Sequence, residues 1–128
     1  MPRDQLPPNI REFIGRNVRS LEQLEILLLV ARDHETVWTV QSVYDVILST
    51  KPSVERWLDE FSRLGLLRKE PHLESTYRFI AAEKDATEIR ELGQLYRTKP
   101  VRIIEAIFNA GRNSAQTFAD AFRIKPTE

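Results

Sequence analysis

The stretch TVQSVYDVILSTKPSVERWLDEFSRLGLLRKE, residues 39–70, decides the fold because it contains two amphipathic helical patterns separated by a short turn. Thr39 is placed to cap the first helix, and Pro52 lies in the first turn of the second, where proline is tolerated. Apolar residues recur at helical spacing in both: Val40, Val43, Tyr44 and Ile47, then Val54, Trp57, Leu58 and Phe61. Gly65 stands where a left-handed cap ends a helix. The stretch predicts a helix-turn-helix, with residues 49–52 as the turn.

Two short segments that favour β structure follow this motif. Residues 66–70 and 75–81 are separated by a break at 71–74. In the second segment Tyr77, Phe79 and Ala81 alternate with the remaining side chains, which is typical of a half-buried strand. The pattern predicts a two-stranded hairpin, the wing of a winged helix.

Helical patterns also precede the motif. Asn9 is placed to cap a short helix over residues 9–16, which buries Ile10, Phe13 and Ile14. Ser20 caps the next helix, and Gln23 is expected to complete its capping box. The apolar stripe of that helix comprises Leu21, Leu24, Leu27, Leu28 and Ala31. Further apolar residues widen the stripe to most of the circumference, so we expect this helix to be central.

Three helices are expected after the wing. Asp85 with Glu88 predicts a capping box that opens a helix ending near residue 97. Thr98 is placed to cap a second helix, and Ser114 a third. Their apolar faces are Val101, Ile104, Ile107 and Phe108 in the second helix, and Ala115, Phe118, Ala119 and Phe122 in the third.

The chain of 128 residues is long enough for one domain with one core. We expect a mainly α-helical domain with a small β-hairpin over residues 1–128. It comprises a winged helix-turn-helix core at 20–82, an N-terminal helix and a helical extension at 83–128. No apolar run approaches the roughly 20 residues of a membrane span, and the first residues do not resemble a secretory signal, so the expected location is cytoplasmic.

Composition and motifs argue against catalysis and against a metal or cofactor. The chain has no cysteine, which excludes disulfides, thiolate zinc sites and a cysteine nucleophile. His34 lies between Asp33 and Glu35, but three consecutive residues of a helix point in different directions and do not converge on one ion. His72 lies in a polar loop without a visible catalytic partner, and the four glycines are isolated, so no phosphate-binding loop is present. We therefore expect a protein that is not an enzyme and needs no cofactor.

Charge is abundant but balanced, with 19 basic and 19 acidic residues. The second helix of the motif, residues 51–64, carries three charges of each sign. Arg56 with Glu60, and Asp59 with Arg63, have the four-residue spacing of helical ion pairs worth about 0.3 kcal/mol each. Any attraction to nucleic acid must therefore come from a few local cations rather than from the whole molecule.

Residues 39–82 resemble, in the order of their parts, the winged-helix domains of bacterial regulators of the MarR-like kind. The resemblance rests on the strings TVQSV at 39–43, SVERWL at 53–58, LGLLRK at 64–69 and YRF at 77–79. The step from Gly65 into the wing is its most specific part, since a glycine cap must lead into a strand that leaves the helix sharply. The C-terminal half, with Tyr96 and residues 99–104 and 118–123, is similar to short bacterial winged-helix proteins with no assigned function.

The resemblance implies a DNA-binding transcriptional regulator that acts as a homodimer joined through the flanking helices. In the family the second helix of the motif enters the major groove of double-stranded DNA and the wing touches the neighbouring backbone. Carried over to this sequence, the DNA-binding residues are Lys51, Ser53 and Arg56 in the helix, and Arg68, Lys69, His72 and Arg78 in the wing.

A second hypothesis remains open, because Glu55, Asp59 and Glu60 share the surface expected to face DNA. Acidic side chains close to phosphates usually oppose binding. In this alternative the winged helix is a protein-protein interaction module that does not bind DNA. Its partner-binding residues would be Tyr96, Phe118 and Phe122, since an amphipathic terminal helix either folds back or docks on another chain.

Overall fold

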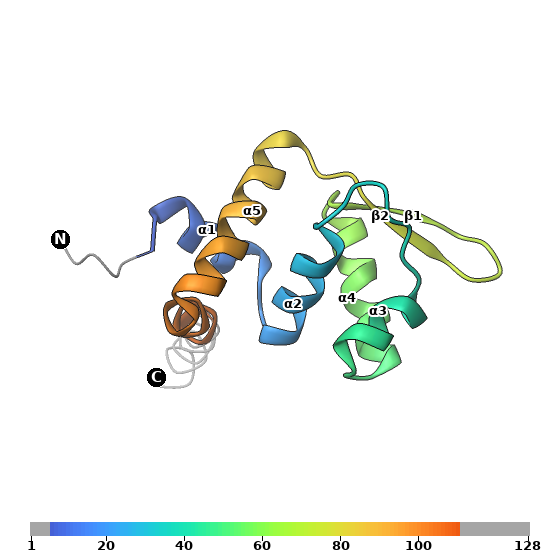
Figure 1. The fold of residues 1–128 in the computed structure, drawn as a ribbon, viewed down its shortest axis with the longest axis horizontal. Helices are drawn as coiled ribbons and strands as arrows, with labels where there is room; N and C mark the ends of the chain where they lie inside the picture. The colour runs from blue at the N-terminus through green and yellow to red at the C-terminus, as the bar shows by residue number, and fades with distance from the viewer. Residues whose placement is uncertain (1–5, 111–128) are drawn as a thin grey trace, which may run out of the picture.

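The computed structural model describes residues 6–110, which form six helices and one antiparallel hairpin (Figure 1). The elements before the hairpin are α1 (Pro8–Asn17), α2 (Leu21–Val30), α3 (Val40–Ile47) and α4 (Lys51–Arg63). The hairpin consists of β1 (Leu67–Glu70) and β2 (Thr76–Phe79), and it is followed by α5 (Glu83–Thr98) and a helix over residues 100–110. The predicted fold class, a winged helix-turn-helix with added helices, is confirmed.

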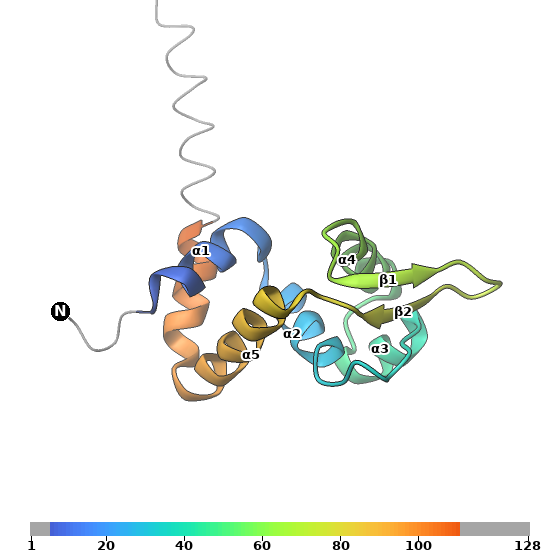
Figure 2. The same ribbon diagram turned by 90° about the horizontal axis from the view of Figure 1, so that it is seen from above.

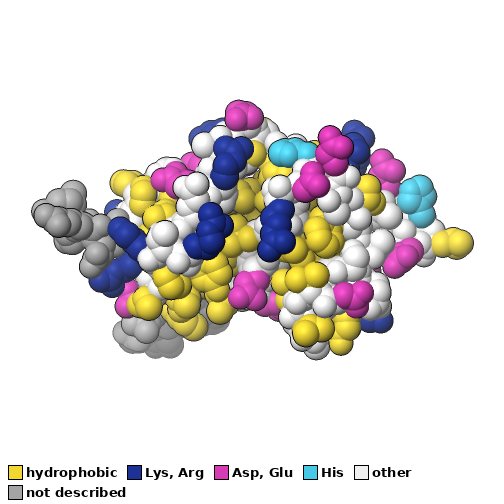
Figure 3. Space-filling model, viewed as in Figure 1, with side chains coloured by type: hydrophobic (Ala, Val, Ile, Leu, Met, Phe, Trp, Pro, Cys, Tyr) yellow, Lys and Arg dark blue, Asp and Glu magenta, His cyan; other side chains and the backbone are white. Residues whose placement is uncertain are grey.

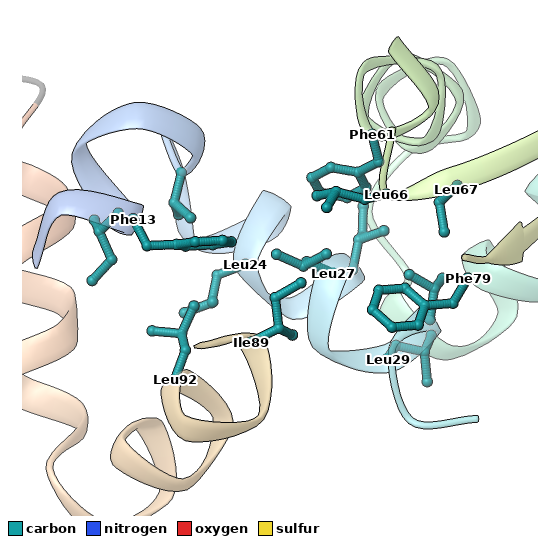
Figure 4. Close-up of a cluster of buried hydrophobic side chains, with 14 of the residues drawn as sticks. Phe13, Leu24, Leu27, Leu29, Phe61, Leu66, Leu67, Phe79, Ile89 and Leu92 are labelled. Atoms are coloured by element: carbon teal, nitrogen blue, oxygen red, sulfur yellow. The ribbon is translucent and has the colours of Figure 1, made fainter. Parts of the chain in front are cut away.

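Helix α2 lies at the centre of the domain, as predicted. Its side chains pack against α1 and α5 on one side and against α4 and the hairpin on the other (Figure 4). Leu24 and Leu27, which are fully buried, occupy the middle of this core. Leu21, predicted to join the same stripe, is exposed instead. A helix surrounded on most sides is apolar around most of its circumference, which explains why the whole run from residue 26 to residue 30 is apolar.

Ser20 caps α2 by accepting a hydrogen bond from the backbone N–H of Gln23 at 3.0 Å, as predicted. The predicted capping box is wrong in its second half, because Gln23 Oε1 accepts from the N–H of Arg19 at 2.6 Å rather than from that of Ser20. Gln23 Nε2 also donates to the carbonyl oxygen of Asn17 at 2.6 Å. The amide of Gln23 is thus buried with both ends satisfied, and it fastens the end of α1 to the start of α2.

Three other predicted caps are wrong. Helix α1 begins one residue early, after Pro7, so Asn9 lies inside the helix; a proline at the first helical position leaves no N–H to satisfy. Helix α5 begins at Glu83, and the intended capping residue Asp85 lies within its first turn, where acidic residues favour the helix dipole. Glu88, the predicted partner of Asp85 in the capping box, is buried. Thr98, predicted to cap the next helix, instead ends α5, and its hydroxyl donates to the carbonyl of Gln94.

The helix over residues 100–110 presents a different face from the one predicted. Ile103 and Ile107 are buried, whereas Val101 and Phe108 are 61% and 67% exposed. The predicted final helix, with its cap at residue 114, lies outside the described residues. None of the helices in residues 6–110 combines the length and the apolar composition that a bilayer span needs.

The hairpin, formed by β1 and β2 (Figure 2), follows directly from Gly65. The φ of Gly65, +83°, is the left-handed conformation predicted for the helix cap. The strands of the hairpin pair in the register Leu67↔Phe79, Arg68↔Arg78, Lys69↔Tyr77 and Glu70↔Thr76. Leu67, Tyr77 and Phe79 are buried, which confirms the predicted alternation. Trp38 forms an isolated antiparallel bridge with β2, because its backbone exchanges two hydrogen bonds of 2.7 Å with that of Tyr77.

Candidate nucleic-acid interface

The start of α4 is set by the turn that joins it to α3. Leu48 ends α3 in the left-handed conformation, with φ of 60°, and Thr50 then caps α4 by accepting a hydrogen bond from the N–H of Ser53 at 3.3 Å. Lys51 is exposed at the first position of the helix, and its Nζ lies 5.6 Å from the centre of the Tyr44 ring. The turn therefore presents one cation at the N-terminal end of α4. The helix dipole and the free backbone N–H groups at this end also favour anions.

Ser53, predicted to contact DNA, is engaged inside the protein. Its hydroxyl donates a hydrogen bond of 2.8 Å to Glu22 Oε1 of α2. The same oxygen accepts a hydrogen bond of 3.2 Å from Trp57 Nε1, one turn further along α4. Glu22 thus joins the first two turns of α4 to the first turn of α2. Sequence patterns missed this contact because Glu22 and Trp57 are 35 positions apart.

Several groups act on the carboxyl of Glu22. Burial raises its pKa, but the facing hydroxyls, the indole of Trp57 and the charge of Arg56 together hold the pKa below its ordinary value. The facing hydroxyls are those of Ser53 and Ser49, although the Ser49 hydroxyl does not reach hydrogen-bond geometry. Glu22 is therefore ionised at neutral pH, next to the surface of α4.

Arg56 lies on the exposed face of α4, as predicted, with its guanidinium carbon 5.4 Å from the centre of the Trp57 ring. The predicted ion pair between Arg56 and Glu60 does not form. Glu60 instead pairs with Arg63, three positions along, and the hydrogen bond from Arg63 lowers the pKa of Glu60. Arg56 forms no ion pair among the described residues, so its donors remain available to a ligand.

The second predicted pair, Asp59 with Arg63, is also replaced. Asp59 Oδ1 accepts hydrogen bonds from Lys69 Nζ at 2.8 Å and from the Tyr77 hydroxyl at 2.7 Å, both from the hairpin. Burial raises the pKa of Asp59, but these two hydrogen bonds and the charge of Lys69 outweigh it and lower the pKa. Asp59 thus links α4 to the wing, and it neutralises Lys69, a predicted phosphate contact.

Two wing arginines remain without an acidic partner in the described part of the chain. Arg68 and Arg78 are both exposed and lie directly opposite each other in the hairpin register. Since Tyr77 and Lys69 face α4, the alternation of strands places Arg68 and Arg78 on the other face of the hairpin. Like charges placed directly opposite destabilise a hairpin, so this pair favours a bound anion.

The tip of the wing has a different character. His72 lies 3.7 Å from Glu70, and the fully exposed Leu73 follows it, next to Glu74. His72, predicted to contact phosphate, therefore lies among acids. The structure places the predicted cations on α4 and on both faces of the hairpin. Within residues 6–110, four of them form no ion pair: Lys51, Arg56, Arg68 and Arg78.

The surface of the described residues is hollowed on α4 and beside α5. A shallow hollow of about 490 Å³ lies on α4, and it is lined by Pro52, Glu55, Arg56, Asp59, Glu60 and Arg63. A larger groove of about 800 Å³ separates α5 from α2 and α3. Arg32, Arg90 and Arg97 line this groove beside apolar residues, and basic side chains border apolar surface in the middle of the face shown in Figure 3. Sequence reasoning missed the groove because its walls come from segments far apart in the chain.

The remaining predicted residues lie away from α4. Tyr96, predicted to bind a partner, lines the larger groove, and its hydroxyl donates a hydrogen bond of 3.2 Å to Glu25 of α2. His34 packs against the edge of the Phe79 ring, with the ring centres 5.1 Å apart. Phe118 and Phe122 lie outside the described residues.

Comparison with known proteins gives a fold but no family assignment from sequence. No family model matches the chain, and no curated protein matches it either. Among solved structures, a MarR family transcriptional regulator from Streptomyces coelicolor is 13% identical, with 91% of this chain and 80% of that chain covered and a TM-score of 0.54.

Two further structures agree. MepR, a transcription regulator of the Staphylococcus aureus multidrug efflux pump MepA, is 10% identical, with 91% of this chain and 87% of that chain covered and a TM-score of 0.51. A mutant of ZitR from Lactococcus lactis is 14% identical, with 83% and 74% covered and a TM-score of 0.51. These likenesses show that the chain has the MarR-like winged-helix fold.

Proposed function

We propose that this protein is a cytoplasmic DNA-binding transcriptional regulator, with α4 as its recognition helix and the hairpin as its wing. The observation that carries the proposal is the placement of Arg56 on α4 and of Arg68 with Arg78 on the wing, all exposed and without acidic partners in residues 6–110. An arginine on a recognition helix can donate two hydrogen bonds to a guanine edge. Wing arginines can contact phosphates and fix the register on the duplex.

The balanced charge of α4 sets an expectation for affinity. Glu60 with Arg63, and Asp59 with Lys69, neutralise each other on or beside α4. Binding therefore depends on the few free cations, which each release about 0.9 counterions per phosphate contacted. We expect weak attraction to arbitrary DNA, and a specific complex whose dissociation constant rises with salt by a slope set by the number of these cations that contact phosphates.

We also propose that the protein acts as a homodimer joined through its flanking helices. Val101 and Phe108 of the helix at 100–110 are exposed apolar side chains, and burial of such residues stabilises a subunit contact. Phe108→Glu is expected to shift the protein to monomer in sedimentation velocity, whereas Val46→Glu, at an exposed apolar position of α3, should leave the mass unchanged. An unaltered dimer after Phe108→Glu would place the contact elsewhere.

The alternative, a protein-protein interaction module that does not bind DNA, is favoured by the wing tip. There the fully exposed Leu73 is flanked by Glu74 and by His72 beside Glu70, an arrangement that suits a basic or apolar protein surface better than a phosphate backbone. The hydrogen bond between Ser53 and Glu22 also favours this alternative, because it engages a side chain that was predicted to contact DNA.

One experiment decides between the two functions. Random duplexes are selected on the full-length protein, and the affinity for the recovered site is measured by fluorescence anisotropy over a series of salt concentrations. Arg68→Ala and Arg78→Ala should each weaken binding and lower the salt slope by about one. Arg11→Ala on α1 removes the same charge at a distance from α4 and serves as the control. Failure to recover or retard any duplex at low salt would reject the proposal and favour the interaction module.

A further inference from the structure

Three side chains form a continuous chain of contacts from the interior to the exposed face of α4. Glu22 Oε1 of α2 accepts a hydrogen bond from Trp57 Nε1 at 3.2 Å, and the Trp57 ring in turn lies 5.4 Å from the guanidinium carbon of Arg56. Trp57 is half-buried, while Arg56 is exposed. The orientation of the indole is therefore fixed from within the protein, and its outer side is occupied by the arginine.

The position of Trp57 is fixed by hydrogen bonding as well as by the contacts of its ring. The indole N–H is its single hydrogen-bond donor, and Glu22 uses it. Glu22 Oε1 also accepts a hydrogen bond of 2.8 Å from Ser53, which lies on α4 like Trp57. The other oxygen of Glu22, Oε2, is buried without a hydrogen-bond partner in the described residues. Because Oε2 has no donor within residues 6–110, the two hydrogen bonds to Oε1 satisfy the carboxylate, and breaking either would leave its charge less satisfied.

Arg56 gains orientation from this arrangement without losing its donors. A guanidinium stacked on an aromatic face keeps its planar edge free for bidentate hydrogen bonds. Exposed arginine side chains otherwise sample many rotamers, and ordering them on binding weakens affinity. Lys51 and Tyr44 show a similar contact at 5.6 Å, but a lysine lacks the planar edge.

We propose that Trp57, held by Glu22, is the residue that positions Arg56 for reading a base pair. The proposal rests on the proposed DNA-binding function and names the determinant of its specificity. Glu22 and Trp57 act through Arg56 and touch no DNA themselves.

The test uses the full-length protein and the site selected from random duplexes. The base pair read by Arg56 is identified as the position whose preference Arg56→Ala abolishes. Wild type should prefer the selected base there by about tenfold or more. Trp57→Phe keeps an aromatic ring but removes the indole N–H, and it should reduce that preference by about threefold or more, with little effect on binding to unrelated duplexes. Ser53→Ala removes the other hydrogen bond to Glu22 and should reduce the preference less than Trp57→Phe does, because the hydrogen bond from the indole remains.

Two further variants separate positioning from charge. Glu22→Gln retains an oxygen that accepts from Trp57, so it should preserve the base preference while overall affinity rises. Glu22→Ala should lose the preference. In an Arg56→Ala background Trp57→Phe should have no further effect on specific binding, because its influence passes through the arginine.

The outcomes distinguish this proposal from the function on which it rests. If wild type binds no duplex, the DNA-binding function itself fails. If wild type reads a base through Arg56 but Trp57→Phe leaves the preference intact, only the positioning role is overturned. An equal loss from Trp57→Phe with and without Arg56 would also overturn it, since the tryptophan would then act on DNA binding by another route.

Discussion

The hydroxyl of Tyr77 lies 2.7 Å from Oδ1 of Asp59, and this hydrogen bond ties the wing to α4. Lys69 Nζ lies 2.8 Å from the same oxygen and 5.7 Å from the centre of the Tyr77 ring. One strand of the hairpin supplies the lysine and the other the tyrosine, so a single carboxylate on α4 contacts both strands. The angle between α4 and the wing is therefore set by side chains as well as by the turn at Gly65.

Tyr77→Phe should lower the free energy of unfolding by about 1–2 kcal/mol, because Asp59 loses a donor at a partly buried position. Tyr96→Phe provides the matched control. The Tyr96 hydroxyl donates to an exposed carboxylate, Glu25, at 3.2 Å, so its removal should matter less. Urea denaturation of the two variants measures the difference. Equal losses would mean that the Asp59 contact does not stabilise the wing.

Asp59 should also make stability depend on pH. Its pKa is lowered in the folded protein from an ordinary value of 3.8, despite the opposing effect of burial, by Lys69 and Tyr77. A carboxyl whose pKa is lower when folded stabilises the fold above its unfolded pKa and loses that contribution as pH falls through the folded value. The stability gap between wild type and Asp59→Asn should therefore be widest at neutral pH and narrow below about pH 4. In a Tyr77→Phe background the pH dependence should be weaker.

The sequence predicted the elements well because each depends on local chemistry. Helical spacing of apolar residues, the caps at Ser20 and Thr39 and the glycine at 65 identified α2, α3, α4 and the entry to the wing. Caps failed where a competing local preference decided the boundary, such as the proline that starts α1 one residue early. The order of elements then implied the fold, which the structure confirms.

The site was less predictable because its charges are arranged by contacts between distant segments. Arg56, Glu60 and Asp59 were expected to pair along the helix, but Lys69 and Tyr77 take Asp59 and leave Glu60 to Arg63. Spacing along one helix shows which pairs are possible and gives no information on competitors from another element. Three of the six charges on residues 51–64 are paired, namely Asp59, Glu60 and Arg63, whereas Lys51, Glu55 and Arg56 form no ion pair within the described residues.

The left-handed conformation of Leu48, with φ of 60°, was also not predicted, because a leucine rarely adopts it. Leu48 is 70% exposed, so little packing compensates for the strain. Leu48→Gly should therefore raise the free energy of unfolding by about 0.5–1 kcal/mol. Val46→Gly, at an exposed position inside α3, should instead lower it by about 1 kcal/mol. Thermal and urea denaturation test the pair, and a loss of stability in both variants would contradict the strain at Leu48.

Glu55 is the acid on α4 that we expect to oppose the proposed DNA binding most directly. It is exposed beside Arg56, it lines the shallow hollow on the helix, and it forms no ion pair within the described residues. If α4 enters the major groove, Glu55→Gln should strengthen binding by roughly fivefold at low salt, since removing one charge near a phosphate changes the free energy by about 1 kcal/mol. The gain should shrink as salt screens the charge.

Glu12→Gln on α1 makes the same change in net charge far from α4, and it should leave the affinity nearly unchanged. Fluorescence anisotropy on the selected duplex at two salt concentrations compares the variants. An equal gain from Glu12→Gln would show that only net charge matters. A loss of affinity in Glu55→Gln, together with a lost preference for cytosine at one position, would show that Glu55 accepts a hydrogen bond from a base and is itself part of the recognition surface.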